Sequence, residues 1–385
     1  MRFAAAISRH PSSPDATAEV VGEVLERLAG PPPDLALLFC STAHAEAFDD
    51  IVGTVRALVG PQRLVGVTAG GVIGGPEEVE DEPALSLWAG RLGYVPEPVR
   101  LTAAGTSAGV ALQGLPQPVA GRRQTVLLLA DPFSLPVPDI LDAMASRSPR
   151  PSPVIGGLAS SGLSPGRNRL ALDGEVHRDG GVGVLLDGVD TVVSQGCRPV
   201  GQPMIVTRAE GNMVLEVAGR KAVEQLESLL GRLGEEDRAL VADGGLHVGI
   251  VADEHQLSFD RGDFLVRNVV GVDRERGALA VGATPEVGTT VQFLLRDADS
   301  ADEDLRALLA GREAEAALLF TCNGRGRLLF GEPDHDARVV ADHIAGQAVA
   351  GMFCAGEIGP VGPRSFLHGF TASVLLFPSP PAVEG

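Results

Sequence analysis

The residues best suited to hold a polar or charged ligand follow an apolar run near the C-terminus. After Ala317-Leu318-Leu319-Phe320 the chain reads Thr321-Cys322-Asn323-Gly324-Arg325-Gly326. Ligands of α/β proteins commonly bind at the carboxyl ends of strands, so the amide of Asn323 and the guanidinium of Arg325 stand at a typical binding edge. A planar guanidinium donates paired hydrogen bonds to a carboxylate. We therefore expect Arg325 to hold either a ligand carboxylate or an acidic neighbour within the protein.

Two further ionisable side chains follow downstream. Glu357 occupies the position at which two related segments carry Val72 and Leu163. A charge that replaces an apolar residue indicates either a functional role or a buried structural partner such as Arg325. His368 precedes the last predicted strand, where its imidazole suits either a satisfied core position or a ligand contact.

Three cysteines stand near the ends of apolar runs. One strand-helix-strand unit would bring Cys322 and Cys354 side by side, and Cys40 has a similar place in an earlier copy. Packing is the expected role, because cysteine is among the most often buried residue types. A nucleophilic thiol with His368 as its base is the alternative. The chain lacks metal-ligand spacing, a Walker loop and a dinucleotide fingerprint, so we predict no metal and no cofactor.

The sequence segments that position these residues occur in three similar copies. Each copy is an apolar run, a polar stretch and a second apolar run that ends in glycines. The copies span residues 35–74, 126–162 and 317–359. Aligning Phe39 with Phe320 and Gly66 with Gly351 leaves connections of similar length. This spacing predicts a strand, a crossover helix and a parallel strand in each copy.

The glycine-rich ends of the copies are predicted to approach a ligand. Glycine exposes backbone N–H groups and permits positive φ. Thr68 and Ser160 lie in these ends in the first and second copies, and we expect both to contact the ligand.

Two modules are predicted. Proline and glycine become dense around residues 196–203, which places the boundary between 1–198 and 199–385. Helices are predicted over 15–28 and 218–233 and from Ser300 onward. The predicted fold class is α/β, with mixed β-sheets that carry helices and are built from internal repeats.

Composition excludes several classes of partner. The 385 residues carry a formal net charge of −19 and no lysine or arginine stripe, which disfavours nucleic acid and anionic membrane surfaces. The apolar run in the first ten residues is too short for a signal peptide, and no later stretch approaches a membrane span. We therefore expect a cytoplasmic protein.

Several motifs together resemble one family, and they cover nearly the whole chain. They are Val65-Gly66-Val67-Thr68-Ala69-Gly70-Gly71, Gly156-Gly157-Leu158-Ala159-Ser160, Phe264-Leu265-Val266-Arg267-Asn268-Val269-Val270-Gly271-Val272-Asp273, Cys322-Asn323-Gly324-Arg325-Gly326, Gly356-Glu357-Ile358-Gly359-Pro360 and Phe366-Leu367-His368-Gly369-Phe370-Thr371. In this order they resemble the N-terminal and C-terminal modules of a stand-alone, bacterial-type FIST protein. The resemblance implies a sensory unit for small molecules such as amino acids, and it brings no catalytic residues. Because no kinase, cyclase, receiver or F-box segment is recognisable, any signal output would pass through a protein partner.

The leading hypothesis is therefore a non-catalytic sensory protein that binds a small polar molecule in a cleft shared by the two modules. The predicted contacts are Asn323, Arg325, Glu357, His368, Cys322, Arg267, Thr68 and Ser160. A cysteine-dependent enzyme of unknown reaction and an adaptor that recruits another protein are the alternatives.

Overall fold

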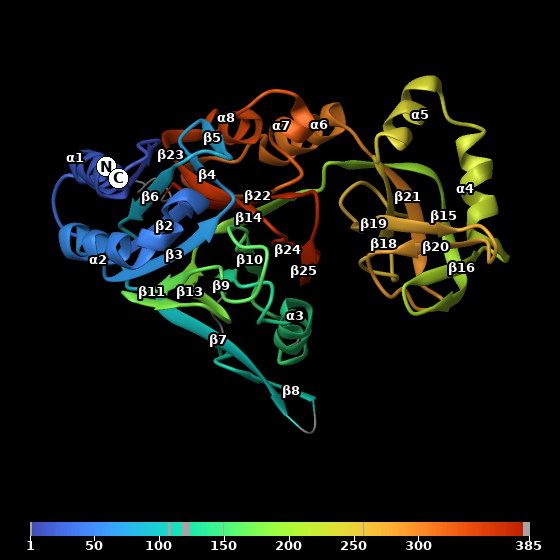
Figure 1. The fold of residues 1–385 in the computed structure, drawn as a ribbon, viewed down its shortest axis with the longest axis horizontal. Helices are drawn as coiled ribbons and strands as arrows, with labels where there is room; N and C mark the ends of the chain where they lie inside the picture. The colour runs from blue at the N-terminus through green and yellow to red at the C-terminus, as the bar shows by residue number, and fades with distance from the viewer. Residues whose placement is uncertain (1, 107–108, 118–123, 149, 257, 380–385) are drawn as a thin grey trace, which may run out of the picture. The chain divides into compact units, whose positions relative to one another are not determined.

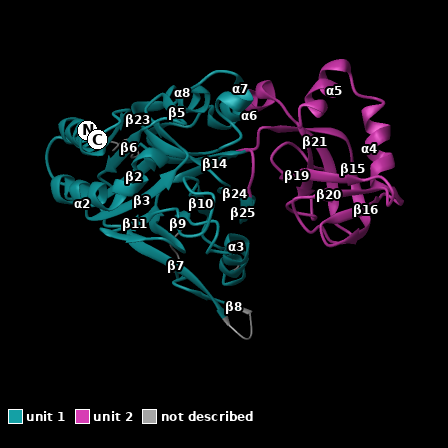
Figure 2. Ribbon diagram, viewed as in Figure 1, with its two compact units in different colours: residues 1–193, 305–367, 371–385 teal, residues 194–304, 368–370 magenta. Residues whose placement is uncertain are grey.

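The computed structural model describes residues 2–106, 109–117, 124–148, 150–256 and 258–379 (Figure 1). The chain forms two compact units, coloured separately in Figure 2. Unit 1 takes Met1–Val193, Leu305–Leu367 and Thr371–Gly385, and unit 2 takes Ser194–Asp304 and His368–Phe370. Mixed sheets carry the helices, so the fold is α/β, as the sequence predicts.

The compact units do not coincide with the modules predicted at 1–198 and 199–385. Unit 2 interrupts unit 1 in the sequence, and the third repeat copy folds into unit 1 together with the first two. The boundary near residue 198 stays a prediction about sequence modules, while the compact units interleave along the chain.

The first repeat copy defines a pattern of strand, helix, strand, hairpin and strand. Its elements are β2 (Leu35–Ser41), η1 (Thr42–Ala47, a 3₁₀ helix), α2 (Phe48–Val59), β3 (Arg63–Ala69), β4 (Gly71–Gly74), β5 (Glu77–Glu80) and β6 (Leu85–Gly90). Strands β2 and β3 pair in parallel, β4 and β5 form the hairpin, and β6 returns antiparallel to β2. Helix α2 ends at Gly60, whose φ of +62° gives the left-handed cap that glycine adopts without strain.

The second and third copies repeat this pattern. The second consists of β9 (Gln124–Ala130), α3 (Val137–Ser146), β10 (Val154–Leu158), β11 (Leu170–Leu172), β12 (Glu175–His177) and β13 (Gly181–Asp187). The third consists of β22 (Ala314–Cys322), α7 (Arg327–Phe330), α8 (His335–Ala341), β23 (Ile344–Cys354), β24 (Glu357–Val361), β25 (Arg364–His368) and β26 (Ala372–Pro378). In both, the two strands that flank the helical connection pair in parallel, and the last strand is antiparallel to the first.

The hairpins are exchanged in a ring among the three sheets of unit 1. Hairpin β4–β5 of the first copy pairs with β23 of the third. Hairpin β24–β25 of the third copy pairs with β10 of the second, and hairpin β11–β12 of the second pairs with β3 of the first. Each copy therefore completes its sheet with strands that belong to another copy.

One further strand precedes each copy and pairs with its last strand. These strands are β1 (Phe3–Ser8) beside β6, β7 (Glu97–Thr106) beside β13, and β14 (Asp190–Ser194) beside β26. Helix α1 (Ser13–Leu28) follows β1, and β8 (Gly109–Gln113) pairs with β7. Most of unit 2 and α6 (Ala298–Leu309) lie between β14 and β22, so unit 2 is an insertion into the third copy.

The register of the parallel pairs confirms the repeat alignment. Leu38 pairs with Gly66, Leu128 with Gly156, and Leu319 with Gly351, so a glycine takes the same place in all three copies. The reason is steric at Gly351, where an added Cβ would lie 1.8 Å from the carbonyl oxygen of Leu319. The glycine lets the two strands approach at this point.

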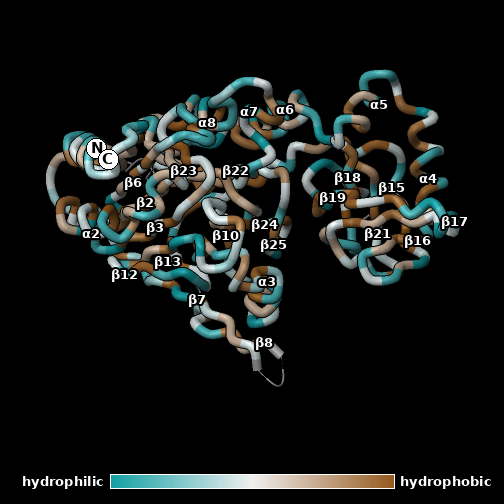
Figure 3. The backbone as a smooth tube through the Cα atoms, in the orientation of Figure 1, coloured by the Kyte–Doolittle hydropathy of each residue, from teal (hydrophilic) through white to brown (hydrophobic). Residues whose placement is uncertain are grey.

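The core of unit 1 draws on the same position in each copy. Phe39, Leu129 and Phe320 are equivalent in the alignment, and all are 0% exposed in one apolar cluster. Two aromatic neighbours close this cluster, since Trp88 packs 4.8 Å from Phe377 between ring centroids. Helices α1 and α2 cover the other face of the first sheet. Hydrophobic colour in Figure 3 accordingly follows strands such as β2. Each buried leucine or phenylalanine stabilises the fold by about 1.5–3 kcal/mol.

The described residues of unit 2 form one sheet, two complete helices and the first part of α6, up to Asp304. Its elements are β15 (Cys197–Glu210), β16 (Met213–Val217), β17 (Arg220–Lys221), α4 (Ala222–Leu230), α5 (Glu235–Ala242), β18 (Leu246–Val251), β19 (Phe264–Asp273), β20 (Ala278–Val281) and β21 (Thr290–Arg296). The predicted helix 218–233 is too long, because Arg220 and Lys221 pair with β16 before the helix begins. The helix predicted from Ser300 begins two residues earlier, at Ala298.

Candidate functional site

Unit 1 contains an open cavity of about 540 Å³ at the strand ends of its repeats. The lining residues come from all three copies. They are Thr42, Ala43, Gly70, Gly71, Glu80, Asp81, Glu82, Pro83, Ser160, Ser161, Leu163, Asn323 and Phe353. Both predicted modules supply lining residues. The glycine-rich strand ends that the sequence indicates therefore meet at one cavity.

Ser160 joins the three copies at this cavity. Its hydroxyl oxygen accepts a hydrogen bond from the backbone N–H of Gly70 at 2.9 Å and donates one to the carbonyl oxygen of Phe353 at 2.6 Å. Gly70 leaves β3, Ser160 follows β10 and Phe353 lies in β23, so one side chain holds together the second strands of all three copies. The hairpin exchange is what brings these ends together.

Asn323 and Thr42 are equivalent residues that both line the cavity. Each stands three positions after the aligned phenylalanines Phe39 and Phe320. The backbone N–H of Asn323 donates to the carbonyl oxygen of Cys354 at 3.0 Å, which fixes the start of the loop and leaves the amide side chain exposed. The predicted contact Asn323 therefore lies at the cavity.

Thr68 is buried next to the cavity and contacts one of its lining residues. It is 0% exposed and is absent from the lining, and its Oγ1 lies 2.6 Å from the Oγ of Ser161. The backbone N–H of Arg169 donates to the same Oγ1 at 2.9 Å. Thr68 thus positions Ser161, which does line the cavity.

The rim of the cavity is acidic. Glu80 ends β5, Asp81 and Glu82 lie in the turn after it, and the lining residues include no lysine, arginine or histidine. Glu80 accepts the backbone N–H of Arg327 at 3.0 Å, and partial burial raises its pKa from the ordinary value. Asp81 has a φ of +57°, a left-handed conformation that aspartate and asparagine tolerate better than most residues. The electrostatic field at this rim favours cations.

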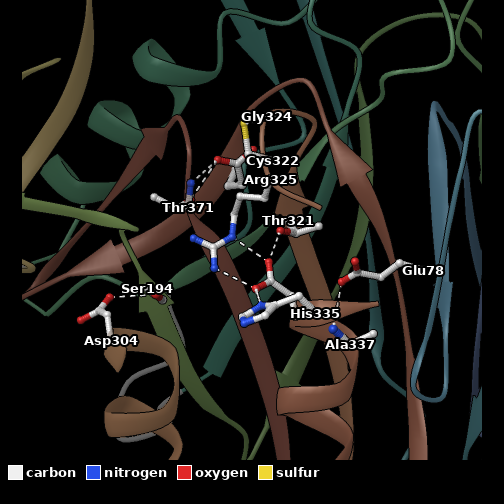
Figure 4. A network of polar contacts seen from close by, with 12 residues as sticks. Glu78, Ser194, Asp304, Thr321, Cys322, Gly324, Arg325, His335, Ala337 and Thr371 are labelled. Atoms are coloured by element: carbon white, nitrogen blue, oxygen red, sulfur yellow. Dashed lines mark hydrogen bonds and ion pairs between the residues drawn. The ribbon is translucent and has the colours of Figure 1, made fainter. Parts of the chain in front are cut away.

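Arg325 does not reach the cavity, because it is buried in an ion pair (Figure 4). Its Nε and Nη2 donate to the two carboxylate oxygens of Asp336 at 2.7 and 2.8 Å, and both side chains are 0% exposed. The guanidinium holds the pKa of Asp336 well below its usual range. Thr321 and His335 also bind this carboxylate. Of the two partners expected for Arg325, the structure has the acidic neighbour.

Glu78 extends this buried network toward the first copy. Its Oε1 accepts the backbone N–H of Ala337 at 2.9 Å, and burial together with the charge of Asp336 raises its pKa to about 8. Glu78 belongs to the exchanged hairpin, so a carboxyl group of the first copy binds the start of α8 in the third.

Glu357 is buried at the start of β24 and is absent from the cavity lining. Its Oε2 accepts hydrogen bonds from the backbone N–H and the hydroxyl of Thr371 at 3.1 and 2.9 Å. Burial raises its pKa to about 8.

The sequence alignment at Glu357 needs one correction. Glu357 pairs with Gly157, Val72 with Met352, and Leu170 with Val67, which are equivalent places in the three sheets. The residue equivalent to Glu357 and Val72 is therefore Leu170. Leu163, which the sequence spacing suggests, lies before the strand and is 95% exposed at the cavity.

The thiols of the third copy are neighbours, and Cys40 is not their equivalent. Cys322 pairs with Cys354 across β22 and β23, as the sequence predicts. Cys40 pairs with Thr68, one place earlier in the register, so it faces the helices and not the inner cluster. The equivalent of Cys322 in the first copy is Ser41.

Two predicted contacts belong to unit 2. His368 ends β25 and is 4% exposed, and Arg267 lies in β19, where its Nη1 donates to the carbonyl oxygen of Val266 at 2.8 Å. Burial lowers the pKa of Arg267. Neither residue lines the cavity of unit 1.

Sequence reasoning missed the acidic turn, Thr42, Ser161 and Asp336. Extending the alignment of Phe39 with Phe320 by three residues would have found Thr42 opposite Asn323. The acidic turn carries no such signal, because it reaches the cavity only through the exchanged hairpin.

No group of three or more His, Cys, Asp or Glu side chains is arranged to hold a metal ion in the part of the chain that the structure describes. Within the same residues, none of the helices has the length and apolar character needed to cross a membrane.

Comparison with known proteins places the chain in a family. The model of the FIST N domain matches residues 34–220, and the model of the FIST C domain matches residues 222–360. The chain belongs to the FIST family. FIST domains are associated with signal transduction and ligand sensing.

Curated relatives cover almost the full chain. An uncharacterized protein of Mycobacterium bovis, Mb0898c, is 40% identical over 386 residues, which cover 98% of this chain and 99% of the relative. The uncharacterized protein MT0656 of Mycobacterium tuberculosis is 40% identical over 385 residues, covering 98% of this chain and all of the relative. Neither name states a ligand.

Proposed function

We propose that this FIST protein is a non-catalytic sensor that binds a small polar molecule carrying an amino group, such as an amine or an amino acid, in the cavity of unit 1. The observation that carries the proposal is the convergence of three repeats on one open, acidic cavity. Its volume of about 540 Å³ lies in the range of small-molecule sites.

The charges at the rim support an ammonium group as the recognised feature. Asp81 and Glu82 are exposed carboxylates beside the cavity, and no cation among the lining residues competes with a ligand for them. A charge-assisted hydrogen bond to a carboxylate contributes about 1.5–3 kcal/mol. Ligands with a net negative charge would be repelled at the same rim.

The uncharged lining supports a polar remainder of the ligand. The amide of Asn323 offers both donors and an acceptor, and the hydroxyl of Thr42 stands at the equivalent place in the first copy. Because Arg325 is bound to Asp336, a ligand carboxylate would depend on these neutral groups. The proposal therefore favours the ammonium end of an amino acid as the anchor.

The sensory part of the proposal rests on the family. FIST domains are associated with signal transduction, and the matched FIST N and FIST C domains cover residues 34–220 and 222–360. We propose that ligand occupancy is read by a protein partner.

Calorimetric titration with a panel of amines, amino acids and dicarboxylates tests the proposal. At least one amine or amino acid should bind, and dicarboxylates should not. Asp81→Asn keeps the left-handed backbone but removes a charge, so it should weaken binding about tenfold.

Asp243→Asn is the matched control. Asp243 is exposed in unit 2, and its replacement removes the same charge away from the cavity. Equal binding by wild type and Asp81→Asn, or binding confined to anions, would refute the cavity as an amine site.

A further inference from the structure

Cys322 and Cys354 lie side by side at the ends of two parallel strands. They are direct partners in the β22–β23 register. Neighbouring strands are about 4.8 Å apart, within the range of roughly 4.4–6.8 Å between Cα atoms that a disulfide requires.

The two side chains point to the same face of the sheet. Side chains alternate along a strand, so Cys322 shares the face of Phe320, and Cys354 shares the face of Met352. Phe320, Met352 and Cys354 all belong to the inner apolar cluster. The pair therefore has both the spacing and the direction that a bond between the sulfur atoms needs.

The two thiols differ in exposure. Cys322 is partly exposed at the end of β22, whereas Cys354 is 0% exposed, and burial raises the pKa of the Cys354 thiol well above its ordinary value. The sulfur atom of Cys354 sits against Gly157, where an added Cβ would lie 2.3 Å away. Cys322 is thus the thiol that a solvent-borne reagent meets first, and Cys354 stands behind it.

Three polar groups surround the sulfur atom of Cys322. The backbone N–H of Gly324 points at its sulfur at 3.4 Å, and the guanidinium of Arg325 is close enough to interact with its charge. The carboxyl group of Glu357 lies beside the thiol, with Oε2 held by Thr371 and Oε1 without a hydrogen-bond partner among the described residues. Burial raises the pKa of Glu357 to about 8, so this carboxyl group takes up and releases a proton near neutral pH.

We propose that Cys322 and Cys354 are a redox pair that forms a reversible disulfide when the protein meets a peroxide. Glu357, in its ionised form, takes the proton of Cys322, and the thiolate attacks one peroxide oxygen. The O–O bond breaks, Cys322 becomes a sulfenic acid, and the leaving oxygen takes a proton to give water or an alcohol. Cys354 then attacks the Cys322 sulfur as its own proton leaves, the S–O bond breaks, and water departs. Two thiols have been oxidised to one disulfide, and one peroxide has been reduced.

The pair is placed to change the cavity. Asn323 and Phe353 line the cavity and directly adjoin Cys322 and Cys354 in the sequence. A bond between the two sulfurs would draw the ends of β22 and β23 together under these two residues. This consequence for ligand affinity rests on the proposed function, whereas the disulfide itself does not.

Intact mass and peptide mapping after treatment of the whole protein with hydrogen peroxide test the pair. The wild type should lose two hydrogen atoms, and the map should link Cys322 to Cys354. Dithiothreitol should restore the starting mass. Cys354→Ser should stop at the sulfenic acid, gaining one oxygen that dimedone traps at Cys322, and Cys322→Ser should react much more slowly.

Two controls separate this pair from general thiol oxidation. Cys40→Ser should form the same link as the wild type, because Cys40 is fully buried on the other face. Glu357→Gln should slow the first oxidation about tenfold while leaving the linked product unchanged. Circular dichroism checks that each variant is folded.

The proposal is overturned if the treated wild type keeps its thiols reduced, or if the link joins any other two cysteines. These readings need no ligand. A normal disulfide without any amine binding would thus reject the proposed function and keep the redox pair.

Discussion

The hydroxyl oxygen of Ser160 lies 2.9 Å from the backbone nitrogen of Gly70 and accepts its hydrogen bond. The same hydroxyl donates to the carbonyl oxygen of Phe353. One small side chain therefore connects the second strand of each repeat at the wall of the cavity. The cavity depends on this connection as much as on the residues that face its opening.

Ser160→Ala should destabilise unit 1 by about 1–3 kcal/mol, because it leaves the N–H of Gly70 and the carbonyl of Phe353 without their partner. Urea denaturation measures the loss. Ser164→Ala, at an exposed serine four residues away, should change the free energy of unfolding by less than about 0.5 kcal/mol. Equal effects of the two changes would contradict the role given to Ser160.

Gly351→Ala should be strongly destabilising, by about 2 kcal/mol or more, because the added Cβ would collide with the carbonyl oxygen of Leu319. Gly53→Ala is the opposite case. Gly53 is exposed inside α2 with no atom within 4 Å of an added Cβ, so alanine should stabilise by about 0.5–1 kcal/mol. Thermal and urea unfolding of the two variants should move in opposite directions.

Asp336→Leu should destabilise the protein by about 3–5 kcal/mol, since it leaves the buried guanidinium of Arg325 without its counter-charge. Adding Arg325→Met should recover part of this loss, because no unpaired charge then remains. Arg338→Met breaks the pair with Asp334, the residue before α8. Because the Arg338 side chain is 53% exposed, this change should cost less than about 1 kcal/mol. A double variant as unstable as the sum of its singles would contradict the coupling.

Stability should fall as pH rises between about 5 and 8, in part because of Glu357. Its pKa is about 8 in the folded protein against an ordinary value of 4.5, so the folded state holds a proton that the unfolded state has released. The contribution is complete below pH 4.5 and is lost as pH approaches 8, at about 1.4 kcal/mol per pH unit for one group. Glu357→Gln should flatten this slope in urea titrations. The exposed control Glu97→Gln should leave the slope unchanged.

The three repeats were predictable from the sequence, but the pairing of strands between different repeats was not. Glycine at Gly66, Gly156 and Gly351 marks a contact between neighbouring strands of one copy, so local spacing was enough to align them. The pairing of β4 with β23 joins residues that are far apart in the chain, and no local pattern specifies it. The sequence therefore could not predict that the acidic turn next to β5 lines the cavity.

Among the predicted contacts, position along a strand mattered more than chemical type. Asn323 directly follows β22, Ser160 lies two residues after the end of β10, and both line the cavity. Arg325 is two residues further on, inside a turn that closes with its N–H on the carbonyl of Cys322, and Asp336 binds it from α8. The sequence left open whether the guanidinium of Arg325 binds a ligand or an acidic residue of the protein. In the structure its partner is an acidic residue.

The exchange of hairpins in a ring makes the three repeats depend on one another for their structure. A single repeat, expressed alone, would lack the hairpin that completes its sheet, and its own hairpin would have no strand to pair with. Although the sequence shows three consecutive repeats, none of them can be removed as an independent unit. The three repeats therefore form a closed ring that must fold and unfold as a whole, and the cavity that they share is lost with it.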